Sequence, residues 1–108
     1  MKRPSGENVA PAEVEAFIRT HPAVQDAYLV GVPDEKYGEE LCAWIQLRPG
    51  AEPLTADAVR EFATGRLAHY KIPRYVRIVD EFPMTVTGKV RKVEMRTVSA
   101  NELGLQAP

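Results

Sequence analysis

Two neighbouring stretches of the chain have the hydrophobic patterns of β-strands: residues 24–32, a β-rich run with Tyr28, Val30 and Val32 to one side, and residues 41–47. In the second stretch, successive side chains fall on two sides of the predicted strand. Leu41, Ala43, Ile45 and Leu47 share one side, and Cys42, Trp44 and Gln46 share the other. A period of two residues is typical of β-strands. Residues 33–38 lie between the stretches and have the composition of a turn. The pattern therefore predicts an antiparallel pair of strands.

Two other stretches have the spacing of amphipathic helices. Residues 11–20 begin with proline, carry glutamates early and place Val14, Phe17 and Ile18 on one face. The second helix follows Thr55, a residue type that caps helix N-termini. Its apolar stripe consists of Val59, Phe62, Ala63 and Leu67. The two patterns predict one helix before the strand pair and one after it.

The last third of the chain predicts a strand over residues 75–79, a turn-rich loop over 80–88 and a short helix over 90–98. Residues 99–108 lack a hydrophobic period, and we expect a flexible tail there. The element order predicts an α+β fold: a small three-stranded sheet, formed by the antiparallel pair plus a further strand, with helices packed on one face. We assign residues 1–4 to a lead-in or expression remnant and residues 5–98 to the domain.

The composition limits what such a domain can be. A chain of 108 residues has the size of one small domain and is too short to enclose a large substrate cleft alone. Its 14 basic and 15 acidic residues argue against nucleic acid as the main partner, because nucleic-acid-binding domains are usually strongly basic. The single cysteine, Cys42, excludes a disulfide framework and favours a reducing compartment, so we expect a cytoplasmic protein. No apolar run approaches the roughly 18 residues of a membrane span.

Few residues suggest catalysis by themselves. The sequence has no Ser/His/Asp grouping, no paired histidines and no glycine-rich loop of the P-loop kind. His21 and His69 are isolated, and helix-end or surface roles explain them. Cys42 neighbours Trp44 and is interpreted as a packed thiol, with a nucleophile as the alternative. No metal site is predicted.

The stretch over residues 83–92 is the most informative one, because two threonines and a glycine precede Lys89 just before a helix. An ammonium group on a flexible stem can bridge a carboxylate and a phosphate, and it can offset negative charge that grows in a transition state. A solvated basic loop is the simpler interpretation. A third interpretation is a small polyanion-binding patch, made of Lys89, Arg91, Lys92 and Arg96.

Three motifs, in this order, resemble the C-terminal lid domain of the adenylate-forming superfamily, which comprises acyl-CoA synthetases, luciferases and peptide-synthetase adenylation domains. They are residues 6–15 (GENVAPAEVE), 67–76 (LAHYKIPRYV) and 83–92 (PMTVTGKVRK). The turn over 31–39 and the approach to Lys89 most resemble bacterial acyl-CoA synthetases. The chain begins just before the first motif, and we expect it to be a piece cut near the hinge of a longer enzyme, with a truncated open reading frame as the alternative.

The resemblance implies a two-step, ATP-dependent acid–thiol ligase. A carboxylate attacks the α-phosphate of ATP to give acyl-adenylate and pyrophosphate, and CoA then takes the acyl group and releases AMP. It further implies that an N-terminal adenylation domain holds ATP, Mg²⁺ and the carboxylic acid, while this small domain rotates between the two steps. The chain alone is therefore expected to be inactive.

By motif match, the resemblance assigns roles to individual residues. Lys89 is the adenylation lysine, which contacts the carboxylate and phosphate oxygens. The residues assigned to the CoA side are Ser5, Gly6, Tyr37, Tyr70 and Lys71. The first two belong to the loop that lines the pantetheine tunnel, where glycine lets the backbone approach the ligand. The tyrosines are assigned to the adenine of CoA and the lysine to its phosphate, with core or surface packing as the alternative for both tyrosines.

The same stretch also resembles a recognition pattern for protein modification. Pro83, followed at a short distance by Gly88 and Lys89, resembles the sequence that lysine acetyltransferases use on such synthetases. Acetylation of Lys89 would remove the charge that catalysis needs, and a deacetylase would restore it. For the isolated chain, the alternative to a ligase domain is a stand-alone CoA-binding, anion-binding or docking module without ligase activity.

Overall fold

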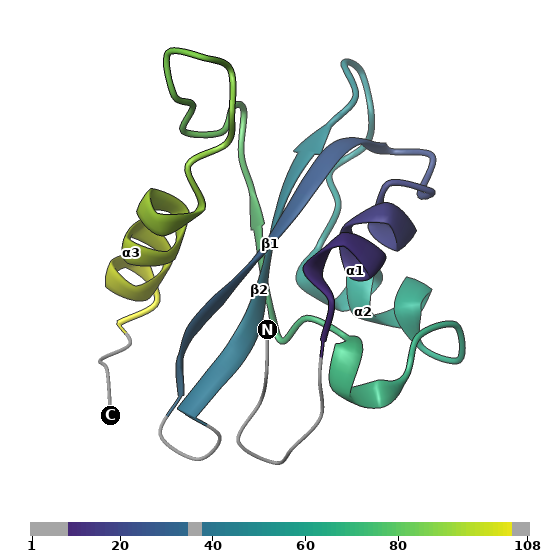
Figure 1. Cartoon of the computed structure of the whole chain (residues 1–108). Helices are drawn as coiled ribbons and strands as arrows, with labels where there is room; N and C mark the ends of the chain where they lie inside the picture. The colour runs from purple at the N-terminus through teal and green to yellow at the C-terminus, as the bar shows by residue number, and fades with distance from the viewer. Residues whose placement is uncertain (1–8, 35–37, 105–108) are drawn as a thin grey trace.

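The computed structural model describes residues 9–34 and 38–104, in which a three-stranded sheet lies between helices (Figure 1). In chain order the elements are α1 (Pro11–Ile18), β1 (Val24–Asp34), β2 (Gly38–Leu47), α2 (Ala56–Ala63), a short 3-10 helix η1 (His69–Lys71), β3 (Tyr75–Ile78) and α3 (Lys92–Glu102). This combination confirms the predicted α+β fold class.

The sheet has the order β1-β2-β3, so β2 is its central strand. β1 and β2 are antiparallel neighbours, with Tyr28 opposite Trp44, which confirms the predicted strand pair. β3 runs parallel to β2 and places Val76 beside Ala43. A parallel neighbour requires a crossover connection, and the segment that contains α2 and η1 supplies it.

Each face of the sheet has its own core. The first core lies under α1 and α2 and includes Val14, Ile18, Leu29, Leu41, Ala43, Ile45 and Val59. The second core lies under α3 and consists of Val30, Val32, Cys42, Trp44 and Met95 (Figure 1). The prediction that the helices pack on one face is therefore wrong. Both alternating sets of side chains in β2 are apolar, so both faces of this strand must be covered.

The helix boundaries follow the sequence signals in part. The Thr55 hydroxyl accepts a hydrogen bond from the Ala58 N–H at 3.1 Å, which confirms the predicted N-cap of α2. α1 starts at the predicted proline but ends at Ile18. α3 begins two residues later than predicted and continues through Glu102. The predicted start of the tail is wrong, because Ser99 is fully buried against the second core.

Candidate functional site

Lys89 follows the tip of a tight hairpin formed by residues 83–91, here called the Lys89 hairpin. The Gly88 N–H donates to the Thr85 carbonyl at 3.0 Å, and the Thr85 N–H donates to the Lys89 carbonyl at 2.7 Å. Gly88 has a φ of +87°, a backbone conformation that residues other than glycine rarely adopt. These features are typical of a short hairpin loop closed by a glycine bulge. The glycine before the lysine is therefore required by the backbone.

The two threonine hydroxyls further order the tip of the Lys89 hairpin. Thr85 Oγ1 accepts a hydrogen bond from the Lys89 N–H at 3.0 Å. The same oxygen lies 2.9 Å from Thr87 Oγ1, within hydrogen-bond distance. At the base, the Arg91 N–H donates to the Pro83 carbonyl at 2.8 Å. The backbone that carries Lys89 is thus fixed by hydrogen bonds at the tip and at the base.

The ammonium group of Lys89 differs from those of the other lysines in the described ranges. Lys71 is paired with Glu13 at 2.8 Å and Lys92 with Glu15 at 2.6 Å. Lys89 is exposed, and among residues 9–34 and 38–104 its ammonium has neither a hydrogen bond nor an ion pair. An unpaired cation on an ordered hairpin can approach an anion that lies outside the domain.

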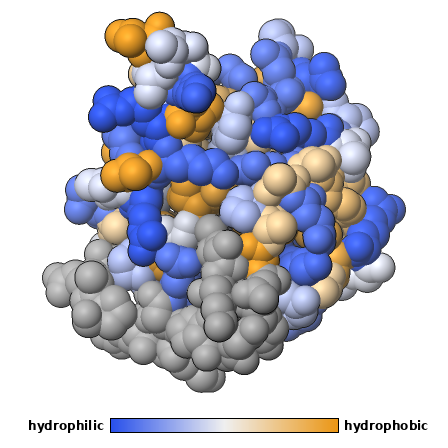
Figure 2. Space-filling view, viewed as in Figure 1, coloured by the Kyte–Doolittle hydropathy of each residue, from blue (hydrophilic) through white to orange (hydrophobic). Residues whose placement is uncertain are grey.

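The other cations near Lys89 do not form a free basic patch. Arg91 lies 3.5 Å from a carboxylate oxygen of Glu94, Lys92 is paired with Glu15, and Arg96 lies 3.0 Å from a carboxylate oxygen of Glu39. Each ion pair neutralises part of the charge that a polyanion would need. Two exposed neighbours on the Lys89 hairpin, Met84 and Val86, are apolar. Exposed apolar side chains accordingly interrupt the hydrophilic surface at this end of the molecule (Figure 2).

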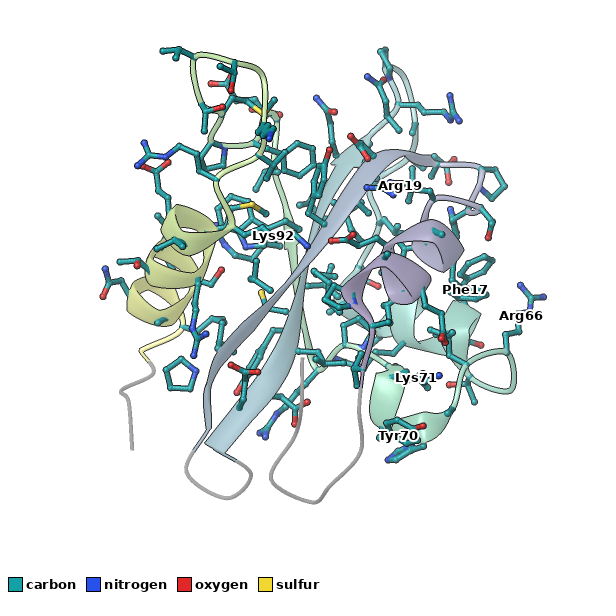
Figure 3. All side chains as sticks on the ribbon, viewed as in Figure 1. Phe17, Arg19, Arg66, Tyr70, Lys71 and Lys92 are labelled. Atoms are coloured by element: carbon teal, nitrogen blue, oxygen red, sulfur yellow. The ribbon has the colours of Figure 1, made fainter. Side chains whose placement is uncertain are left out.

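Tyr70 and Lys71 lie on η1, away from the Lys89 hairpin (Figures 1 and 3). Lys71 Nζ donates to both carboxylate oxygens of Glu13, at 3.1 and 2.8 Å, and this hydrogen bonding raises the pKa of the lysine. The Tyr70 ring packs against the first core, and its centroid lies 5.7 Å from Lys71 Nζ. An anion that binds Lys71 must therefore share the ammonium with Glu13.

The strand directions separate the candidate residues into two groups. β3 is parallel to β2, so the Lys89 hairpin leaves the sheet beyond the end of β2 at Leu47. β1 ends at Asp34 and β2 begins at Gly38 at the opposite end of the sheet, and η1, which precedes β3, lies at that end too (Figure 1). The structure thus does not bring Lys89 together with Tyr70 and Lys71. The other three sequence-predicted residues, Ser5, Gly6 and Tyr37, lie outside the described residues.

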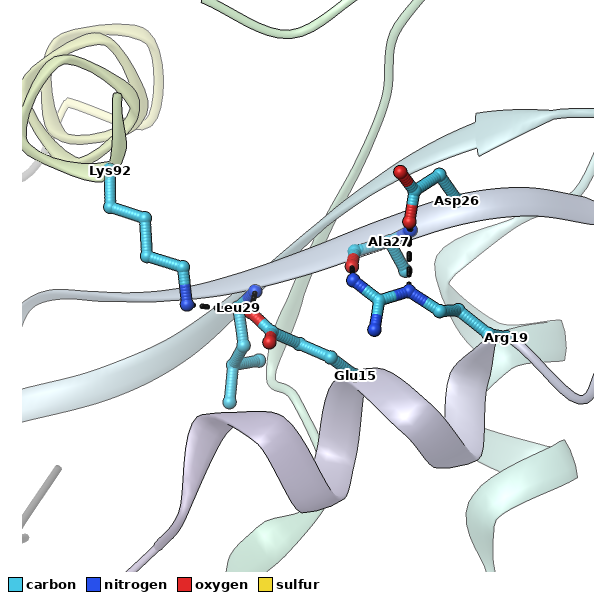
Figure 4. A network of polar contacts seen from close by, with 6 residues as sticks. All are labelled: Glu15, Arg19, Asp26, Ala27, Leu29 and Lys92. Carbon is cyan, nitrogen blue, oxygen red and sulfur yellow. Dashed lines mark hydrogen bonds and ion pairs between the residues drawn. The ribbon is translucent and has the colours of Figure 1, made fainter. Parts of the chain in front are cut away.

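A polar network that the sequence did not predict connects α1, β1 and α3 (Figure 4). Glu15 on α1 accepts hydrogen bonds from the Leu29 N–H at 2.8 Å and from Lys92 Nζ at 2.6 Å. Nearby, Arg19 donates to Asp26 at 2.8 Å and to the Ala27 carbonyl at 2.7 Å. Glu15 and Lys92 are 77 residues apart, so no local spacing indicates the pair. The sequence signal that could have indicated the network is Glu15, a charged residue beside the apolar face of the predicted helix over residues 11–20.

The remaining polar candidates have structural environments. Cys42 is buried, burial raises the pKa of its thiol, and Sγ lies 3.8 Å from Ser99 Oγ. A thiol with a raised pKa is a poor nucleophile, which supports the interpretation as a packed residue. The ring of His21 packs edge-on against Phe62 with centroids 4.7 Å apart, and its Nδ1 accepts the Ala23 N–H at 3.0 Å.

The described ranges show neither a metal-binding cluster nor a membrane-spanning helix. Residues 9–34 and 38–104 contain no cluster of three or more His, Cys, Asp or Glu side chains that could hold a metal ion. None of the helices in this part of the chain is long and apolar enough to cross a bilayer.

The fold and the Lys89 hairpin define a class of protein: a small α+β domain with a lysine ammonium that is exposed on an ordered hairpin and unpaired among the described residues. The sequence profile of the AMP-binding enzyme C-terminal domain matches residues 13–89. The chain therefore belongs to this family, as its three motifs predicted.

Acyl-CoA ligases and synthetases are among the relatives and solved structures that match. The chain is 46% identical over 100 residues to "Medium-chain acyl-CoA ligase ACSF2, mitochondrial" of Danio rerio. The aligned residues cover 93% of this chain and 16% of that protein. It is 47% identical over 91 residues to "Putative acyl-CoA synthetase YngI" of Bacillus subtilis (strain 168), covering 84% of this chain and 16% of that one. Apo MatB from Rhodopseudomonas palustris superposes with a TM-score of 0.87 at 31% identity, over 94% of this chain and 20% of that chain. A Mycobacterium tuberculosis fatty acyl CoA synthetase gives 0.81 at 34% identity, over the same shares.

The chain is much shorter than the proteins that it matches. It spans 16% of the length of the curated relatives and 20% of the matched structures. It thus corresponds to the C-terminal domain of acyl-CoA synthetases, which confirms the family predicted from the motifs.

Proposed function

We propose that this chain acts as the mobile C-terminal domain of an ATP-dependent acyl-CoA synthetase. Its partner is an N-terminal adenylation domain, which binds the carboxylic acid and ATP. Mg²⁺ is assigned to that partner on the resemblance to the adenylate-forming superfamily. The synthetase forms acyl-adenylate and pyrophosphate first, and acyl-CoA and AMP second. A cytoplasmic location stays a prediction.

In this proposal Lys89 contacts the substrates in the first step. The observation that carries the assignment is its exposed ammonium group, unpaired among the described residues, on a hairpin held by hydrogen bonds. Negative charge gathers on the carboxylate and α-phosphate oxygens as the adenylate forms, and a preorganised cation stabilises that charge. Removing one such donor typically lowers the rate by about 10²–10³-fold.

The second step uses the opposite end of the domain. Ser5, Gly6, Tyr37, Tyr70 and Lys71 are assigned to the CoA side. Two observations support this division for the described residues: η1 lies at the end of the sheet away from the Lys89 hairpin, and Lys71 carries a positive charge there. A rotation of the whole domain would exchange the two ends at the active site, as in other domain-closure mechanisms.

The test compares Lys89→Ala with wild type in the full-length synthetase that carries this domain. Pyrophosphate release from ATP and an acid panel measures the first step, and thioester formation from preformed acyl-adenylate measures the second. We expect only the first step to fall, by about 10²–10³-fold. Arg48→Ala is the matched control, because Arg48 is an exposed cation in a different loop. If both steps survive in Lys89→Ala, Lys89 belongs to a solvated loop and the assignment is wrong.

The alternative, a stand-alone CoA-binding or anion-binding module, gives a different result. In that case the isolated chain would bind CoA at micromolar concentration, which calorimetric titration measures. The isolated chain should lack ligase activity both as a synthetase domain and as a stand-alone binding module.

Lys89 is also the proposed target of a lysine acetyltransferase and a deacetylase. Its exposure supports access by a modifying enzyme, and acetylation would abolish the positive charge. Mass spectrometry of the native enzyme tests this proposal. An acetyl group at Lys89 that correlates with loss of the first step supports it, whereas an unmodified Lys89 under all growth conditions contradicts it.

A further inference from the structure

The ion pair between Glu15 and Lys92 joins elements on opposite faces of the sheet. Glu15 belongs to α1, which covers the first core, and Lys92 is the first residue of α3, which covers the second. The pair meets at β1, the edge strand, where the same Glu15 oxygen also accepts the Leu29 N–H. The Glu15 side chain is 9% exposed and that of Lys92 is 42% exposed. A carboxylate this deeply buried needs its partners, because desolvation of an unpaired charge is costly.

Lys92 directly follows the base of the Lys89 hairpin. The Arg91 N–H bonds to the Pro83 carbonyl at 2.8 Å, and Met84 and Val90 form an antiparallel bridge. These contacts make the hairpin one unit, so its position depends on how its two ends are attached to the domain. On the N-terminal side, Phe82 packs edge-on against Tyr28 with ring centroids 4.9 Å apart. On the C-terminal side, the attachment is Lys92.

We propose that Glu15 and Lys92 are positioning residues for Lys89, an inference that rests on the proposed function. Their ion pair fixes the start of α3 against α1 and β1, and thereby fixes the direction in which the Lys89 hairpin projects from the domain. The Lys92 ammonium itself points into the network around Glu15 (Figure 4). Its effect on adenylation therefore passes through Lys89 and not through a contact with substrate.

The substitution that tests this role is Lys92→Met in the full-length synthetase, because methionine keeps an unbranched stem and removes the charge. We expect the pyrophosphate-releasing step to fall by about 10-fold to 100-fold, since misplacement of a catalytic group by about 1 Å can have an effect of this size. The thioester step from preformed acyl-adenylate should be unchanged. Lys92→Arg should restore most of the first step, because it can keep the ion pair with Glu15.

A matched control and a double variant separate positioning from general structural damage. Glu94→Gln removes one charge from the same turn of α3 without touching α1, and should leave both steps unchanged. In a Lys89→Ala background, Lys92→Met should cause no further loss in the first step, because its effect acts through the missing lysine. Glu15→Gln should reproduce the selective loss seen in Lys92→Met.

The outcomes distinguish this inference from the proposed function. If Lys89→Ala abolishes the first step but Lys92→Met lowers both steps equally, or lowers the first step further in the Lys89→Ala background, the positioning role is wrong and the proposed function stands. If Lys89→Ala leaves the first step intact, the proposed function itself fails. Far-UV circular dichroism of each variant reports whether the domain is folded, and the Lys92→Arg rescue provides the test should Lys92→Met be unfolded.

Discussion

The indole Nε1 of Trp44 lies 2.7 Å from Ser99 Oγ and donates a hydrogen bond to it inside the second core. The serine hydroxyl in turn donates to the Met95 carbonyl at 2.7 Å, one turn earlier in α3. Both side chains are buried, with Trp44 3% and Ser99 0% exposed. This contact connects the central strand to the C-terminal helix, and therefore to the helix that follows Lys89.

Substitution of Ser99 should destabilise the domain. Ser99→Ala removes the acceptor for the Trp44 N–H and leaves a buried donor without a partner. We expect the free energy of unfolding to fall by about 1–3 kcal/mol. Thr97→Ala is the control, since Thr97 makes the same type of hydrogen bond to a carbonyl one turn earlier but is exposed, and it should change stability by less than about 0.5 kcal/mol. Urea unfolding followed by circular dichroism measures both, and equal effects would contradict the role of Ser99.

The sequence predicted the parts of the fold that local patterns encode. The alternation in residues 41–47 indicated β2, the short turn indicated its antiparallel partner, and Thr55 indicated the start of α2. The packing between elements that are distant in sequence could not be predicted from such local patterns. The position of α3 on the far face depends on Cys42 and Trp44, which were recognised as the second side of β2 but not as a second core.

The candidate site was predictable to a different extent at each position. Lys89 was proposed as a candidate because of the turn residues before it, and the positive φ of Gly88 shows why a glycine is needed in that turn. The ion pair of Lys71 with Glu13, and that of Lys92 with Glu15, join residues far apart in sequence. No spacing rule indicates such contacts, because they depend on how α1 packs against other elements.

The tip of the Lys89 hairpin should be sensitive to a side chain at Gly88. An alanine at φ +87° is strained, and the left-handed conformation costs an L-residue about 1–2 kcal/mol. We expect Gly88→Ala to shift the hairpin and to lower the pyrophosphate-releasing step of the synthetase. Gly50→Ala is the matched control, because Gly50 has a φ of +79° in a different turn. Both variants should lose similar stability in thermal unfolding, and a similar loss of adenylation in both would contradict a specific role for the hairpin.

Alkaline pH should destabilise the domain, and Cys42 should contribute first. Burial raises the pKa of the Cys42 thiol above its ordinary 9.0 and also that of Tyr28 above 10.0, while the Glu13 hydrogen bond raises the pKa of Lys71 above 10.5. In each case the folded state holds the proton more tightly than the unfolded chain. The stabilisation is therefore present below these ordinary pKa values and is lost as pH rises through the folded-state values.

A comparison of wild type with Cys42→Ala measures the thiol contribution. The free energy of unfolding of wild type should fall as pH rises above 9.0, and the variant should show a flatter dependence between pH 9.0 and 10.0. Urea unfolding at a series of pH values provides both curves. Because Cys42→Ala also removes a buried side chain, its curve should lie lower throughout, and only the slope tests the argument. Parallel slopes would show that Cys42 does not titrate differently in the two states.

The ion pair between Lys71 and Glu13 leads to opposite expectations for two substitutions in the full-length synthetase. If Lys71 contacts a phosphate of CoA, then Lys71→Met should raise the KM for CoA by roughly tenfold, the size expected for a lost charged hydrogen bond. Glu13→Gln should lower that KM, because the ammonium is no longer shared with a carboxylate. Neither substitution should alter pyrophosphate release, which depends on the other end of the domain.

Pantetheine separates a phosphate contact from a general change at this surface. It has the thiol arm of CoA but lacks the nucleotide, so its KM should not respond to either substitution. A Lys71→Met enzyme that loses affinity for CoA and pantetheine alike would indicate that the ion pair only holds η1 against α1. A variant that loses affinity for CoA alone would assign Lys71 to the nucleotide. It would also assign separate substrates to the two ends of the domain, as the proposed rotation between the steps requires.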